Sequence, residues 1–148
     1  MKPGPIIAAC VIIAGLLLLP RRVKASELVV TFNRPIDPAK LCDAILKVEG
    51  AQFSRNPYQF KEDLWHELCP QVPLDLANGR QMRSAALRHV CNLIALLEEA
   101  KIPRTVQNVA CCFNAGFDAV LLNKLDAKQR DYGYRVFNCY QDSEASGK

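Results

Sequence analysis

The sequence predicts a mainly α, single-domain protein, and three observations support this prediction. Apolar residues recur at spacings of three and four along several segments, which is the pattern of a helix with one buried face. Sustained alternation of apolar and polar residues, the pattern of strands, is absent after a short extended segment at residues 27–36. The chain has 148 residues, of which 50% are hydrophobic, and this suffices for one domain with a core.

The first predicted helix runs from Pro38 to Glu49. Asp37 is a favourable N-cap, proline suits the first helical position, and Gly50 is a common helix stop. The apolar stripe of this helix consists of Leu41, Ala44, Ile45 and Val48. Glu49 projects from the side of that stripe, where loss of water and the negative end of the helix dipole both favour the protonated, acid form. The alternative is a solvated glutamate at a frayed helix end.

Further helices follow a connecting segment at residues 50–60. We expect a loop or small hairpin there, because Asn56-Pro57 is a turn signal. Thr105 is a favourable N-cap for a later helix, which ends at Asn114-Ala115-Gly116. The predicted helices after this connection cover residues 61–68, 80–100, 106–113, 117–123 and 127–140. We expect the tail at 142–148 to be disordered.

The amino-terminal segment predicts export. Residues 6–19 are an unbroken apolar run, short for a membrane span and typical of a signal-peptide core. Val23 and Ala25 would suit cleavage before Ser26, whereas the basic residues beside them would suit an uncleaved anchor. We therefore expect residues 1–25 to be a signal peptide or membrane anchor, and the protein to be periplasmic or secreted.

Charge and cysteine usage narrow the possible partners. The formal charge is +4, but the four basic residues of the leader account for it, so no basic patch favours nucleic acid. Six cysteines lie outside the leader; they could pair as disulfides or be small buried apolar residues. No His/Cys spacing is typical of a zinc site, and we expect neither metal nor cofactor.

Four short motifs occur in order along the predicted domain. They are Val48-Glu49-Gly50, Pro57-Tyr58-Gln59-Phe60, Cys112-Phe113-Asn114-Ala115-Gly116 and Arg130-Asp131-Tyr132-Gly133-Tyr134-Arg135-Val136. Their order and spacing resemble the lysozyme-like superfamily, in particular the branch of soluble lytic transglycosylases and goose-type lysozymes. In that branch the catalytic Glu ends a helix, Gly-Leu-Met-Gln and Ala-Tyr-Asn-Ala-Gly segments follow, and a Tyr lies in the last helix. The resemblance covers about residues 37–140 and implies a lysozyme-like catalytic domain over 26–141.

The resemblance implies roles for single residues. Glu49 matches the catalytic acid, and Tyr132 matches the late Tyr that lies near it in the family. The expected substrate-binding residues are Gln59, Tyr58, Phe113, Asn114 and Tyr132. The chain departs from the family pattern where Gly50 replaces a Ser, Tyr58 a Met and Phe113 a Tyr.

The implied activity is cleavage of peptidoglycan glycan strands between N-acetylmuramic acid and N-acetylglucosamine. A hydrolase normally adds a second carboxylate, and none of the candidates Asp63, Asp75 and Asp118 stands out. That absence favours the lytic transglycosylase route, in which one Glu acts as acid and then as base. A hydrolytic muramidase, a non-catalytic wall-binding module on the same fold and a disulfide-bonded secreted interaction protein are the alternatives.

Overall fold

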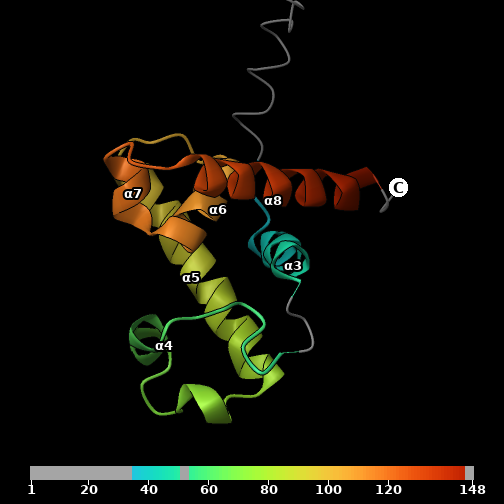
Figure 1. Ribbon diagram of the computed structural model, residues 1–148, viewed down its shortest axis with the longest axis vertical. Coiled ribbons are helices and arrows are strands. Elements are labelled where there is room, and N and C mark those ends of the chain that lie inside the picture. Colours follow the sequence, from blue (N-terminus) through green and yellow to red (C-terminus); the bar gives the residue numbers. More distant parts are fainter. Residues whose placement is uncertain (1–34, 51–53, 146–148) are drawn as a thin grey trace, which may run out of the picture. The chain divides into compact units, whose positions relative to one another are not determined.

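The computed structural model describes residues 35–50 and 54–145, and these are mainly helical with no strand among them. The mainly α prediction is therefore confirmed. The helices are α3 (Pro38–Glu49), α4 (Glu62–Leu68), η1 (Leu74–Leu76), α5 (Gly79–Glu99), α6 (Val106–Ala115), α7 (Phe117–Leu121) and α8 (Ala127–Ala145) (Figure 1). The described residues belong to one compact unit.

Local signals place the helix ends as the sequence predicts. The Asp37 side chain accepts hydrogen bonds from the backbone N–H groups of Ala39 and Lys40, which begins α3. Gly50 ends α3 with a left-handed φ of 62°, a conformation that glycine adopts without steric cost. The Thr105 side chain caps α6, and Gly116, with φ of 91°, ends it.

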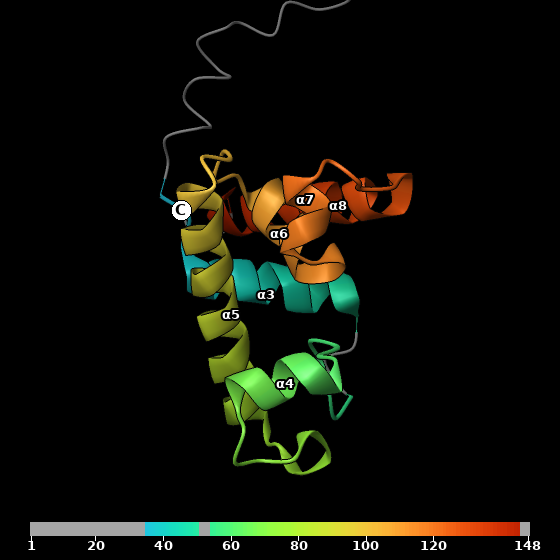
Figure 2. The same ribbon diagram turned by 90° about the vertical axis from the view of Figure 1, so that its left-hand side faces the viewer.

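The helices pack around α3 and α5. Helices α6 and α8 lie against each other, and α8 also packs on α3. Both ribbon views place α3 between the level of α6–α8 and the level of α4, while the long helix α5 spans both levels (Figure 2). One hydrophobic cluster joins these elements, with Leu41 and Ile45 from α3, Leu97 from α5 and Val136 from α8 among its fully buried side chains. The core thereby fixes the carboxyl end of α3 against α8.

The structure describes part of the predicted disordered tail but none of the predicted leader. Helix α8 continues to Ala145, so the expectation of a disordered tail is wrong for residues 142–145. The leader at 1–25, most of the extended segment at 27–36 and residues 146–148 lie outside the described residues. Among the helices that are described, none is long and apolar enough to cross a membrane.

The residues after Gly50 form a tight turn where they are described. The side chain of Asn56 accepts a hydrogen bond from the backbone N–H of Phe60 and donates one to its carbonyl. Gln59 takes a left-handed φ of 53° within this turn. The described residues 54–60 thus reverse direction before α4 without pairing as strands, so this part of the connection is a loop and not a hairpin.

Candidate functional site

Glu49 is the last residue of α3, and its carboxylate accepts a hydrogen bond from a residue far away in the sequence. The hydroxyl of Tyr132, on α8, donates to Oε1 of Glu49 at 2.7 Å. Glu49 itself is half-buried, as its position beside the apolar stripe predicts. The structure therefore joins two of the predicted site residues, 83 positions apart, in one polar pair.

Tyr132 is a buried partner, with only 5% of its surface exposed. Burial raises the pKa of its hydroxyl, and the hydrogen bond and negative charge of Glu49 raise it further. The guanidinium of Arg135 lies 5.8 Å from the centroid of the Tyr132 ring. Its positive charge lowers the pKa of the Tyr132 hydroxyl. The phenol consequently keeps its proton at neutral pH and remains a donor to the carboxylate.

The Glu49–Tyr132 pair is suited to proton transfer at the carboxyl. A phenol can donate to a carboxylate and can also accept from a protonated carboxylic acid. The same contact can therefore hold Glu49 in place in both protonation states. Among the described charged groups that influence the pKa of Tyr132, Glu49 is the one carboxylate.

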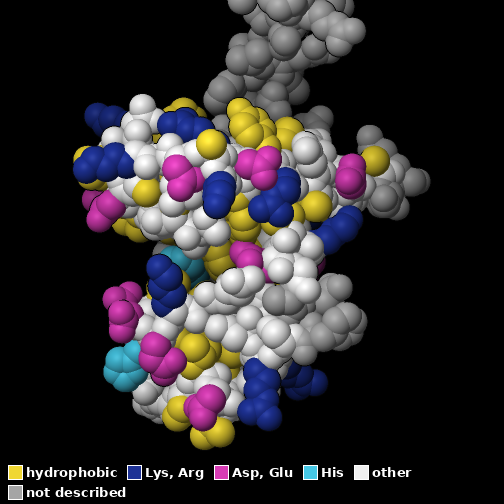
Figure 3. Space-filling model, viewed as in Figure 1, with side chains coloured by type: hydrophobic (Ala, Val, Ile, Leu, Met, Phe, Trp, Pro, Cys, Tyr) yellow, Lys and Arg dark blue, Asp and Glu magenta, His cyan; other side chains and the backbone are white. Residues whose placement is uncertain are grey.

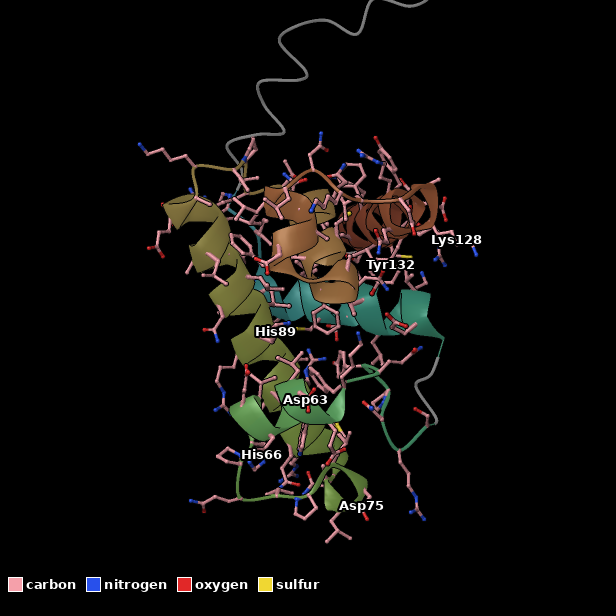
Figure 4. The ribbon with its side chains drawn as sticks, turned by 60° about the vertical axis from the view of Figure 1, so that its left-hand side comes forward. Asp63, His66, Asp75, His89, Lys128 and Tyr132 are labelled. Carbon is pink, nitrogen blue, oxygen red and sulfur yellow. The ribbon has the colours of Figure 1, made fainter. Side chains whose placement is uncertain are left out.

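The aspartates considered as a second carboxylate are all exposed. Asp63 lies in the first turn of α4, Asp75 in η1 and Asp118 in the first turn of α7. Figure 4 shows Asp63 and Asp75 on the part of the protein that holds α4, whereas Tyr132 lies on α8. No described contact pairs any of the three with Glu49.

Tyr58 is a core residue, which corrects the prediction that it lines a substrate cleft. Its side chain is 3% exposed, and its ring packs against Phe60. No regular hydrogen bond reaches its hydroxyl among the described residues, although Arg83 is close enough to act on its pKa. Burial raises the pKa of this hydroxyl more than the Arg83 guanidinium lowers it.

The other predicted binding residues lie around a contact between two phenylalanines. Phe60, from the turn, and Phe113, from α6, have ring centroids 6.0 Å apart. Gln59 and Asn114 are their exposed sequence neighbours, and neither side chain makes a hydrogen bond to a described residue. The ring contact thus brings the turn that follows α3 against the carboxyl-terminal half of α6.

His89 is a further residue of this region, and it is not among the predicted site residues. Its imidazole is half-buried and lies 5.3 Å from the ring of Phe113, measured between centroids. Burial lowers its pKa. The signal was present in the sequence, because His89 follows Ala86 by three residues and precedes Leu93 by four, which places it beside the apolar face of α5.

A hollow separates two parts of the surface near these rings. The space-filling view shows it between the part that holds α6 and α7 and the part that holds α4, with hydrophobic and histidine atoms inside (Figure 3). In Figure 4, His89 projects from α5 at the level between α4 and α7.

A separate cavity of about 310 Å³ lies between α3 and α8 and is lined by Lys40, Asp43, Ala44, Lys47, Cys139, Asp142 and Ser143. That cavity includes none of the predicted site residues.

The cysteines offer no strong nucleophile in the core. All six cysteines outside the leader are free thiols in the structure. Burial raises the pKa of Cys42 and of Cys112 to about 12, so both remain protonated at neutral pH.

Within the described residues, no group of three or more His, Cys, Asp and Glu side chains could hold a metal ion.

No protein-family model, curated protein or solved structure matches the chain significantly. The resemblance to lytic transglycosylases and goose-type lysozymes therefore stays a prediction. The chemistry of the site rests on the described geometry: a helix-terminal carboxyl, its buried phenol partner, and a hollow beside aromatic rings.

Proposed function

We propose that this protein cleaves peptidoglycan glycan strands by a lytic transglycosylase mechanism with Glu49 as its acid and base. The observation that carries the proposal is the hydrogen bond from Tyr132 to the Glu49 carboxylate. This hydrogen bond connects two residues that the motif resemblance assigns to one site. The local sequence patterns that predict the helices do not include this contact.

The proposed reaction moves one proton in each direction at Glu49. Glu49, in its protonated form, gives its proton to the glycosidic oxygen as the bond from that oxygen to C1 of N-acetylmuramic acid breaks. The 6-hydroxyl of the same sugar then bonds to C1, and its proton passes to the Glu49 carboxylate. The product is a 1,6-anhydro sugar, and Glu49 is again protonated.

Tyr132 is a positioning residue in this scheme. Its hydroxyl holds the carboxyl at the end of α3, and this is the one side-chain hydrogen bond of Glu49 to a described residue. No contact within the described part of the chain pairs a second carboxylate with Glu49, and this favours the single-Glu route over a hydrolytic muramidase. We expect neither a metal ion nor a cofactor to take part.

The test is digestion of purified peptidoglycan by the wild-type protein and by Glu49→Gln, with products identified by mass spectrometry. We expect anhydro-muropeptides from the wild type and none from the variant, because the amide cannot donate the proton. Products with reducing ends would establish a muramidase instead. Inactivity of the wild type, with its helical circular dichroism intact, would contradict the enzyme proposal.

The substitution Tyr132→Phe tests whether the Tyr132 hydroxyl positions the Glu49 carboxyl for the reaction. The ring keeps its place in the core, and only the hydroxyl that bonds Glu49 is lost. Since a hydrogen bond to a charged group contributes roughly 1.5–3 kcal/mol, we expect turnover to fall by about tenfold or more. KM should change little. A loss of substrate binding with unchanged turnover would contradict the positioning role.

A further inference from the structure

His89 carries a polar ring whose hydrogen-bonding capacity is not used within the described part of the protein. The imidazole contacts the ring of Phe113, and no described side chain or backbone group is hydrogen-bonded to it. A neutral imidazole has one donor and one acceptor nitrogen. The position therefore offers a donor and an acceptor to a molecule from outside the chain.

The ring contacts around His89 are aromatic. The ring of Phe113 contacts the rings of both His89 and Phe60, and the ring of Phe60 lies 5.7 Å from that of Trp65, measured between centroids. Burial is the cause that lowers the pKa of His89, and no charged side chain of the described structure contributes to that shift. An uncharged polar group beside aromatic rings matches a neutral ligand with hydroxyl or amide groups better than it matches an ion.

His89 lies at the level of the hollow in the surface. His89 projects from α5 between the levels of α4 and α7, and the hollow opens at that level (Figures 3 and 4). Phe113 has no polar atom in its side chain, so the imidazole supplies the polar function at this ring pair. Sites for uncharged ligands combine apolar walls with a few placed polar groups in this way.

We infer that His89 is a ligand-binding residue in the hollow, where its imidazole hydrogen-bonds a hydroxyl or acetamido group of an N-acetylated glycan. The inference rests on the proposed function for the class of ligand, and it extends the binding residues beyond those that the motifs indicate. His89 binds and orients the sugar and takes no part in proton transfer at the glycosidic bond.

Two substitutions at His89 separate hydrogen bonding from packing. His89→Phe keeps a ring against Phe113 but removes both nitrogens, whereas His89→Gln keeps a donor and an acceptor. The chain offers a matched control in His66, its one other histidine, which is exposed on α4. His66→Phe should therefore leave binding unchanged.

Binding is measured in the Glu49→Gln background, so that turnover cannot consume the ligand. The probe is a soluble oligosaccharide of alternating N-acetylglucosamine and N-acetylmuramic acid, titrated by calorimetry. We expect His89→Phe to weaken binding by about tenfold, because one lost hydrogen bond at a buried site is of the order of 1–2 kcal/mol. His89→Gln should retain most of the affinity.

A second measurement reads the imidazole directly. The chain contains two histidines, so nitrogen-15 spectra resolve one signal set from His89 and one from His66. We expect the oligosaccharide to shift the His89 signals and to leave the His66 signals in place. Unchanged His89 signals on saturation with the sugar would overturn the inference.

The outcomes keep this inference apart from the proposed function. Sugar binding that is equal in His89→Phe and its parent would overturn the role of His89 and leave Glu49 untouched. Inactive wild-type protein that still binds sugar through His89 would overturn the enzyme and keep the binding residue. Absence of any sugar binding would overturn both.

Discussion

His89 and Tyr132 are both titratable groups that the fold holds in their neutral forms, but for different reasons. Tyr132 is buried and bonded to a carboxylate, and both effects raise its pKa. His89 is half-buried against an aromatic ring, and burial lowers its pKa. Desolvation favours the uncharged form of each, which raises the pKa of an acid and lowers that of a base.

The lowered pKa of His89 predicts a dependence of stability on pH. The folded state disfavours protonation of this ring, so the unfolded state binds more protons below the ordinary value of 6.5. The contribution to the free energy of unfolding is complete above that value. It is lost as pH falls from the unfolded pKa towards the lower folded pKa.

Denaturant unfolding at about pH 8 and about pH 5 measures this contribution. The wild type should lose more stability between the two conditions than His89→Gln, and the difference isolates the histidine from the carboxylates. His66→Gln is the control, because the same change at an exposed position should follow the wild type. Equal losses in all three proteins would contradict the prediction.

At the scale of the elements, the contact of α6 with α8 depends on a glycine. A Cβ atom placed on Gly133 would lie 2.6 Å from the Sγ atom of Cys111 and 3.0 Å from the backbone oxygen of Gln107. Real Cβ atoms essentially never lie 2.6 Å from another heavy atom, so the Cys111 side chain or the backbone of α6 would have to shift. The same helix α8 carries Tyr132, one residue before this glycine.

Gly133→Ala should therefore destabilise the protein by about 1–3 kcal/mol, the usual cost of overpacking. Gly79→Ala is the matched control, since nothing lies within 4 Å of its Cβ position at the start of α5. We expect that control to be neutral or slightly stabilising, because alanine favours helix more than glycine does. Thermal unfolding followed by circular dichroism compares the two, and equal melting temperatures would contradict the close packing of α6 on α8.

At the scale of the whole molecule, one core extends through all the levels of the described structure. Trp65 on α4 is 1% exposed and donates its indole N–H to the carbonyl of Val72 at 2.6 Å. It belongs to the same hydrophobic cluster as Leu41 of α3 and Val136 of α8. A continuous core of this kind makes the elements depend on one another for stability.

Unfolding should consequently be a single cooperative transition. Trp65 is the one tryptophan of the chain, so its fluorescence reports the surroundings of α4, while far-ultraviolet circular dichroism reports all the helices. We expect the two signals to change at the same denaturant concentration. Loss of the fluorescence signal before the helical signal would show that the α4 part unfolds by itself.

The sequence by itself determined the α-helices, several of their ends and the place of Glu49 on α3. These features depend on neighbours within a few positions: Asp37 and Thr105 cap their own helices, and Gly50 and Gly116 adopt backbone angles that other residues avoid. The extent of α8 to Ala145 was missed, because its last turns carry no apolar stripe that would signal a helix.

Only the tertiary structure decided which side chains meet. Tyr132 reaches Glu49 across 83 positions, Tyr58 enters the core and His89 packs on Phe113. The motif resemblance already implied that Tyr132 lies near Glu49, but the hydrogen bond between them depends on how α8 packs on α3. Long-range contacts follow from packing of whole faces and not from any local pattern, so sequence spacing predicts that a residue lies on an inner face without saying what it touches there.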